Sequence, residues 1–174
     1  MASANVLWVN ATGLSFTGTD TVVMAFTASN YTTNFEAYRA FAGAYQTNGW
    51  TVSNTGTCWI QLDAGQAVSA SGYILACPTS YTTRTPKNWT LQGSNTGAFA
   101  GEQTTVDTQT NITTWVAGLE YRYSLSSTQS FRYWRLVSTA CNDASYTGLG
   151  SFKLIVPAAS GSAARQIVGG GLVL

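Results

Sequence analysis

The sequence contains no histidine at all. Histidine is the commonest general base in enzymes, and without it neither a Ser-His-Asp triad nor most zinc sites can be built. A cysteine nucleophile would lack the base that activates it. The seven acidic residues are dispersed, and no motif brings two of them together as a glycosidase requires. We therefore predict a protein that is not an enzyme and that binds no metal or other cofactor.

Charge is scarce as well, because only 9% of the residues are charged against a usual ~25%. The eight cationic residues are scattered and the net charge is +1, which argues against nucleic acid or an anionic membrane as a partner. No apolar run approaches the ~20 residues that span a bilayer, so we expect no membrane insertion. The first residues lack the cationic start of a signal peptide, which indicates synthesis in a cytoplasm. A chain so poor in charge suits a homo-oligomer or a multicopy assembly.

Cysteine is infrequent and occurs at Cys58, Cys77 and Cys141. An odd number at wide spacing does not suggest a disulfide framework or a metal site. We expect buried free thiols at these positions.

What the sequence has in abundance is the composition of a β-protein. Thr, Tyr, Phe, Trp and Val suit a pleated, half-buried surface, and Gly and Asn supply turns. Apolar runs, alternating or continuous, predict strands over residues 5–9, 21–27, 58–64, 71–77, 88–94, 103–107, 120–125, 131–138 and 150–156. No convincing helical period separates these runs. The pattern predicts an all-β antiparallel sandwich in which residues 28–56 form a long ordered loop rich in aromatic rings.

Several stretches between Tyr31 and Val156 form a pattern when they are taken together. They are YRAFAGAYQTNGW (38–50), WIQLDAG (59–65), RTPKNWTLQGSNTG (84–97), FRYWRLV (131–137) and GLGSFKLIV (148–156). In order and spacing they resemble the discoidin-like family, whose members are also called coagulation-factor C-type or galactose-binding-like domains. The resemblance implies a jelly-roll-like β-sandwich without catalytic activity. Its end loops would bind a ligand, most often a glycan and sometimes a protein or a lipid headgroup.

The resemblance also divides the chain into an N-terminal extension (1–20), a discoidin-like sandwich (21–157) and a C-terminal tail (158–174). The tail is rich in small residues and ends in an apolar tip. One interpretation is a flexible tail or one further edge strand. The other is an arm that docks onto a neighbouring subunit and orders on contact. The sequence leaves both open.

The resemblance suggests a bound calcium ion, but two residues of this sequence argue against it. Many members of the family hold a structural calcium ion partly through an Asp in a Phe-Asp-Gly turn and a Glu on the last strand. Here Ala42 stands at the Asp position and Ser151 stands where the Glu is expected. Calcium prefers a cage of oxygens that includes carboxylates, so we predict no strong calcium site of this type.

Residue types that bind sugars gather in the loops at 78–89 and 141–147. Aromatic faces stack on the C–H surfaces of a sugar, and planar polar groups hydrogen-bond its hydroxyls. The candidate ligand-binding residues are Tyr81, Arg84, Asn142, Asp143, Tyr146 and Trp50. Plainer alternatives exist: Arg84 can pair with an acceptor of its own loop, and Asn142 and Asp143 can bond their own backbone in a turn.

The tryptophans of the resembling segments have a different expected role. Trp50, Trp59, Trp89 and Trp134 lie in or beside predicted strands, and we expect them in the core. Trp50 is the ambiguous one, since it lies near the end of a loop and is therefore kept among the ligand candidates.

Two functional hypotheses follow from these features. The first is a surface component of a phage virion, such as a decoration, fibre or tail protein. It would contact other virion proteins through its termini and bind host-surface glycans through its loops. The alternative is a stand-alone or secreted carbohydrate-binding module in the extracellular space. Cytoplasmic synthesis, scarce charge and an apolar tail favour the virion.

Overall fold

The computed structural model describes residues 7–10, 15–17, 25–32, 34–41, 49–53 and 56–157, with side chains from residue 27 onward. Its strands are β1 Leu7–Asn10, β2 Ser15–Thr17, β3 Ala25–Ala28, β4 Trp50–Val52, β5 Cys58–Ala76, β6 Pro86–Ser94, β7 Thr104–Gln109, β8 Glu120–Cys141, β9 Thr147–Leu149 and β10 Ser151–Val156. Two short 3-10 helices, η1 (Ala37–Phe41) and η2 (Thr82–Arg84), complete the described elements. Neither is long and apolar enough to cross a membrane.

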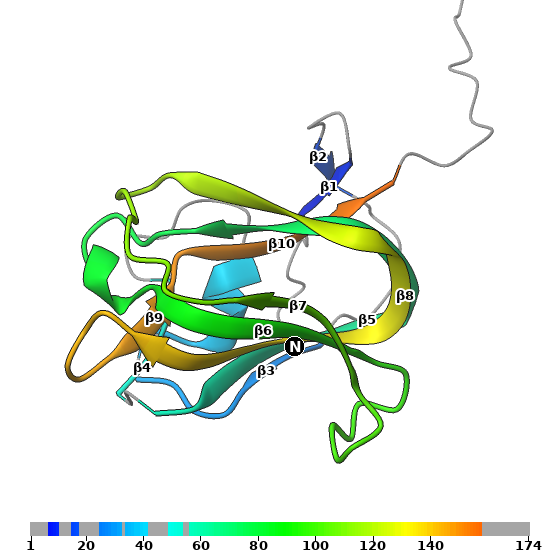
Figure 1. Ribbon diagram of the computed structural model, residues 1–174, viewed down its shortest axis with the longest axis horizontal. Coiled ribbons are helices and arrows are strands. Elements are labelled where there is room, and N and C mark those ends of the chain that lie inside the picture. The colour runs from blue at the N-terminus through cyan, green and yellow to red at the C-terminus, as the bar shows by residue number, and fades with distance from the viewer. Residues whose placement is uncertain are drawn as a thin grey trace, which may run out of the picture.

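Two long strands, β5 and β8, organise the sandwich. They pair antiparallel from Cys58 opposite Ser138 to Ala76 opposite Glu120. The register shifts twice, between Asp63 and Val68 and between Ala70 and Gly72. Such bulges bend a sheet, and Figure 1 shows β5 and β8 curving together at one end, from one layer of the sandwich into the other. The same pair of strands therefore contributes to both layers.

The remaining strands extend this central pair. The sheet order is β2-β1-β10-β5-β8-β6-β7, and β3 also pairs with β5. The neighbours of β5 and β8 are antiparallel to them, whereas β1 pairs in parallel with β10. A separate two-stranded sheet, β4 with β9, lies at the same end of the sandwich as η2 (Figure 1).

The core lies between the two layers and consists of the side chains that point inward from their strands. The largest fully buried side chains are Trp50, Trp89, Trp134, Tyr73, Phe152, Ile60, Leu62, Ile74, Leu75, Leu91, Leu136 and Leu149. Each buried aliphatic side chain stabilises the fold by roughly 1.5–3 kcal/mol. The buried indoles keep their N–H groups satisfied: Trp89 donates to the hydroxyl of Tyr73 (2.9 Å) and Trp134 to the carbonyl of Phe131 (3.0 Å).

The predicted all-β antiparallel sandwich is confirmed, but two of its strands, β5 and β8, are much longer than expected. The runs at 58–64 and 71–77 are one strand, and those at 120–125 and 131–138 are another. Apolar alternation stops at the bend, whereas backbone pairing continues around it. A strand predicted from the side-chain pattern therefore ends too early. The segment 28–56 is not only a loop, since it contains η1 and β4. The tail at 158–174, and with it the docking-arm hypothesis, lies outside the described residues.

Candidate ligand site at the loop end of the sandwich

Two loops that are far apart in sequence lie side by side at the end of the sandwich that carries β4 and β9. The first contains η2, and the second, residues 142–146, connects β8 to β9. The turn of η2 is closed by a hydrogen bond from the Arg84 N–H to the Tyr81 carbonyl (3.1 Å). The second loop joins it through the Asn142 N–H, which donates to the Thr83 carbonyl (3.1 Å). Gly148 permits the close packing behind them, because a Cβ there would lie 2.8 Å from the Thr51 hydroxyl oxygen.

Arg84 lies between two tyrosine rings. Its guanidinium carbon is 3.7 Å from the ring centroid of Tyr81 and 4.3 Å from that of Tyr146. Only 16% of the Arg84 side chain is exposed, whereas Tyr81 is 44% exposed. Cation–π contacts of this kind stabilise by about 0.5–2 kcal/mol each, more as they are desolvated. The rings therefore hold the guanidinium in one position.

Asp143 organises the second loop. One carboxylate oxygen accepts the N–H groups of Ser145 (2.8 Å) and Tyr146 (3.0 Å), and the other accepts the Thr83 hydroxyl (3.3 Å). Burial alone would raise the pKa of Asp143, but these donors outweigh it and the pKa lies below its usual range. Asp143 is therefore an ionised acceptor whose oxygens are already occupied, one by its own loop and the other by Thr83 of η2.

The ion pair between Arg84 and Asp143 is loose. The Nε atom of Arg84 lies 3.9 Å from the nearer Asp143 oxygen, which is too far for a hydrogen bond. Among the described residues no hydrogen-bond partner is found for this buried nitrogen. The two rings thus position a guanidinium whose Nε atom has no hydrogen-bond acceptor among the described residues. A ligand oxygen that approached the guanidinium through the exposed 16% of the side chain would gain a charge-assisted hydrogen bond.

The structure brings together four of the six predicted residues: Tyr81, Arg84, Asp143 and Tyr146. Asn142 is exposed beside them, and its side-chain amide donates to the Ile112 carbonyl of a third loop (3.4 Å). The expectation for Trp50 as a ligand residue is wrong. Trp50 is fully buried and donates its ring N–H to the Asn30 carbonyl (3.0 Å), so it contacts no ligand. The short strand β4 turns its side chain into the core.

A second arginine lies between two rings, and the sequence analysis missed it. The guanidinium carbon of Arg135 is 4.0 Å from the Trp59 ring and 3.7 Å from the Phe99 ring. Unlike Arg84, it donates from Nε (2.9 Å) and Nη2 (2.7 Å) to the side-chain oxygen of Gln61. Trp59 was expected in the core, and that was wrong, because strand alternation turns it onto the outer face with Gln61. The alternation within CWIQLDA was the signal that could have shown this.

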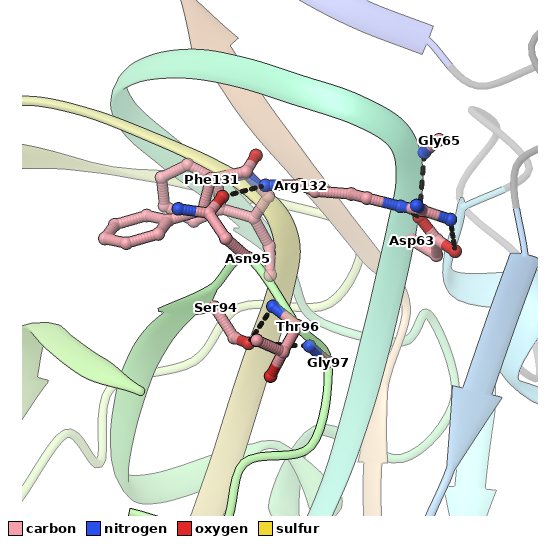
Figure 2. Close-up of polar contacts among 9 residues, drawn as sticks. Asp63, Gly65, Ser94, Asn95, Thr96, Gly97, Phe131 and Arg132 are labelled. Carbon is pink, nitrogen blue, oxygen red and sulfur yellow. Dashed lines mark hydrogen bonds and ion pairs between the residues drawn. The ribbon is translucent and has the colours of Figure 1, made fainter. Parts of the chain in front are cut away.

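The outer face around Arg135 is held by hydrogen bonds within the protein. Figure 2 shows Arg132 forming a bidentate pair with Asp63 at 2.8 and 2.9 Å. The backbone N–H of Arg132 donates to the Asn95 side chain (3.1 Å), and the Ser94 hydroxyl accepts two N–H groups of the following turn. The GSNTG stretch is therefore a structural turn packed on β8, and its polar groups are used internally.

The cysteine thiols, and the residue types that can ligate metals, offer little further chemistry. Cys58 and Cys77 are buried, Cys141 is half-buried, and all three are free. Burial raises the pKa of Cys58 to about 11 and also raises that of Cys77. Within the described residues no three His, Cys, Asp or Glu side chains gather as metal ligands. Of the two calcium-related positions, Ser151 is buried and Ala42 lies outside the described residues.

Comparison with known proteins identifies the fold family to which this structure is similar. No protein-family model and no curated protein matches the sequence. A chitosan-binding module from a chitosanase/glucanase of Paenibacillus sp. IK-5 has a TM-score of 0.64 at 23% identity, covering 76% of this chain and 94% of the module. The family 32 carbohydrate-binding module of Clostridium perfringens NanJ, in complex with galactose, has a TM-score of 0.61 at 15% identity, covering 75% and 92%. An F5/8 type C domain from Bacteroides fragilis has a TM-score of 0.64 at 15% identity, covering 80% and 95%. The chain has the discoidin-like fold.

Proposed function

We propose that this chain is a non-catalytic carbohydrate-binding module whose ligand site is formed by Tyr81, Arg84 and Tyr146. The observation that carries the proposal is the position of Arg84 between two aromatic rings, with a guanidinium nitrogen that no described residue hydrogen-bonds. Structures of the same fold from other organisms are described as binding chitosan and galactose, which supports the assignment by analogy.

The residues would divide the work of binding between them. The exposed ring of Tyr81 offers an apolar face for the C–H surface of a sugar, and Arg84 offers donors to its oxygens. Asp143 acts indirectly, because its hydrogen bonds to the N–H groups of Ser145 and Tyr146 hold the loop that carries the Tyr146 ring. The arrangement needs no proton transfer and no metal to bind a sugar.

A glycan array with matched variants tests the proposal. Tyr81→Ala and Arg84→Gln should each abolish or strongly weaken the signal of the wild-type chain. Arg122→Gln is the control, because Arg122 is an exposed arginine of β8 outside the site. A wild-type chain that binds no glycan and no host cell would remove the proposal, and equal loss in the control would show a nonspecific charge effect.

We propose further that the module is displayed on a phage particle as a decoration, fibre or tail component, present in many copies and held to other virion proteins through its termini. Scarce charge and the apolar end of residues 158–174 support this location. A secreted module in the extracellular space is the alternative. Deleting residues 158–174 separates the two: the truncated chain should fail to join its particle, and assembly equal to wild type would show that the tail is no anchor.

A further inference from the structure

A hollow lies beside the edge strand β3, formed by residues that play no part in the Arg84 site. It is an open groove of about 310 Å³. Its lining residues come from β3, from the segment that follows it and from the start of η1, and are Thr27, Ala28, Tyr31, Glu36, Ala37 and Tyr38. The volume is at the lower end of the ~300–1,000 Å³ range of small-molecule sites, which suits one ring-sized unit.

The groove combines exposed aromatic rings with small residues. Tyr31 is 54% exposed and Tyr38 is 47% exposed, and both are among the few large apolar side chains that the described residues leave open to solvent. Ala28 and Ala37, which also line the groove, have short side chains that leave room for a ligand. Two tyrosines that line a hollow offer flat apolar faces to a ligand that carries C–H groups on one side.

A carboxylate is fixed in the same groove. The Arg39 Nε donates to one Glu36 oxygen at 2.8 Å, and the Asn34 N–H donates to the other at 3.2 Å. The hydrogen bond from Arg39 holds the pKa of Glu36 below its usual range, so the group is an ionised acceptor at neutral pH. Asn34 adopts a left-handed backbone conformation (φ 71°), which asparagine tolerates better than most residues. Glu36 is thus positioned before any ligand arrives.

We propose that this groove is a second carbohydrate-binding site, which takes a single uncharged hexopyranose unit. The sugar would stack its C–H face on Tyr31 or Tyr38 and donate hydroxyl protons to the Glu36 carboxylate. Arg39, which lies beside the groove lining, forms an ion pair with Glu36 at 2.8 Å and offsets its charge, so a uronic acid or an amino sugar gains little from electrostatic attraction. The site is independent of Arg84, and a chain with both sites would bind a polymeric glycan bivalently.

Backbone NMR of the full chain tests the groove directly. The probes are methyl β-galactopyranoside and methyl β-glucopyranoside, titrated at millimolar concentrations into wild type and into the Arg84→Gln variant. We expect amide shifts at residues 27–38 with at least one probe in both proteins. Tyr31→Ala and Tyr38→Ala should each weaken this binding roughly tenfold, and Tyr38→Phe should restore it. Val116→Ala is the control, because Val116 is exposed but does not line the groove.

The outcomes separate the two sites. Shifts confined to residues 81–84 and 142–146 that vanish in Arg84→Gln would overturn the second site and leave the proposed function intact. Shifts at 27–38 that persist in Arg84→Gln would establish the second site even if the first binds nothing. No shift at 27–38 with either sugar would overturn the inference. Both tyrosines are exposed, so a melting temperature equal to wild type should accompany each variant.

Discussion

Removing the Asp143 side chain should loosen the loop that carries Tyr146. In Asp143→Ala the N–H groups of Ser145 and Tyr146 lose their acceptor. Net hydrogen bonds at half-exposed positions stabilise by about 0.5–1.5 kcal/mol each, so we expect the free energy of unfolding to fall by about 1–2 kcal/mol. Asp143→Asn is the matched variant, because its amide oxygen still accepts these bonds, and it should lose much less. Urea denaturation measures both.

The same carboxylate predicts how stability depends on pH. The pKa of Asp143 is lowered in the folded chain, whereas in the unfolded chain it is expected near its ordinary ~3.9. Its contribution is therefore complete above the unfolded value and is lost as the pH falls through the folded value. Asp143→Ala should lack this part of the acid-induced loss. A variant as stable as wild type at neutral pH, or one with an unchanged acid profile, would refute the role assigned to Asp143.

Three further predictions concern the fold, the metal and the thiols. Gly49→Ala would place a Cβ 2.0 Å from the Leu149 carbonyl oxygen. The neighbour is backbone and cannot rotate away, so we expect a loss of about 3 kcal/mol in thermal or urea unfolding; a wild-type melting temperature would contradict the packing of β4 on β9. A chelator should leave the melting temperature unchanged, and a large drop would reveal a metal that the ligand chemistry does not favour. Iodoacetamide at neutral pH should label Cys141 before Cys58 and Cys77, since these two are buried and their pKa values are raised; mass spectrometry after proteolysis reads the order, and faster labelling of Cys58 would contradict its burial.

Much of the candidate site could be found from residue types in loops. Tyr81 and Arg84 precede one strand, and Asp143 and Tyr146 precede another, so a sandwich with paired strands brings their loops to one end. The plainer interpretation of Asp143 as a turn residue is also correct, because it bonds its own backbone. What no pattern could supply is the stacking of Arg84 between two rings from separate loops, since that depends on distances between distant segments.

The two errors about tryptophans share one origin, which is the direction in which a side chain points. Trp50 was kept as a ligand candidate because it lies near a loop end, but three residues of β4 are enough to turn it inward. Trp59 was assigned to the core because it belongs to a strand of the resembling segments, but the outer face of the sheet holds it against Arg135. The groove beside β3 went unnoticed because Tyr31 and Glu36 lie in a stretch without periodicity.

The sequence by itself determined the all-β class, the antiparallel sandwich and the loops that meet at one end, because these follow from local alternation and turn residues. Only the tertiary structure decided that β5 and β8 each pass through both layers, since hydrogen bonding between strands continues where the apolar pattern stops. It also decided which arginine finds a hydrogen-bond acceptor for its Nε atom within the protein. Arg135 is bonded by Gln61 across the sheet and Arg84 is not, and such pairings are set by the register of strands rather than by residue type.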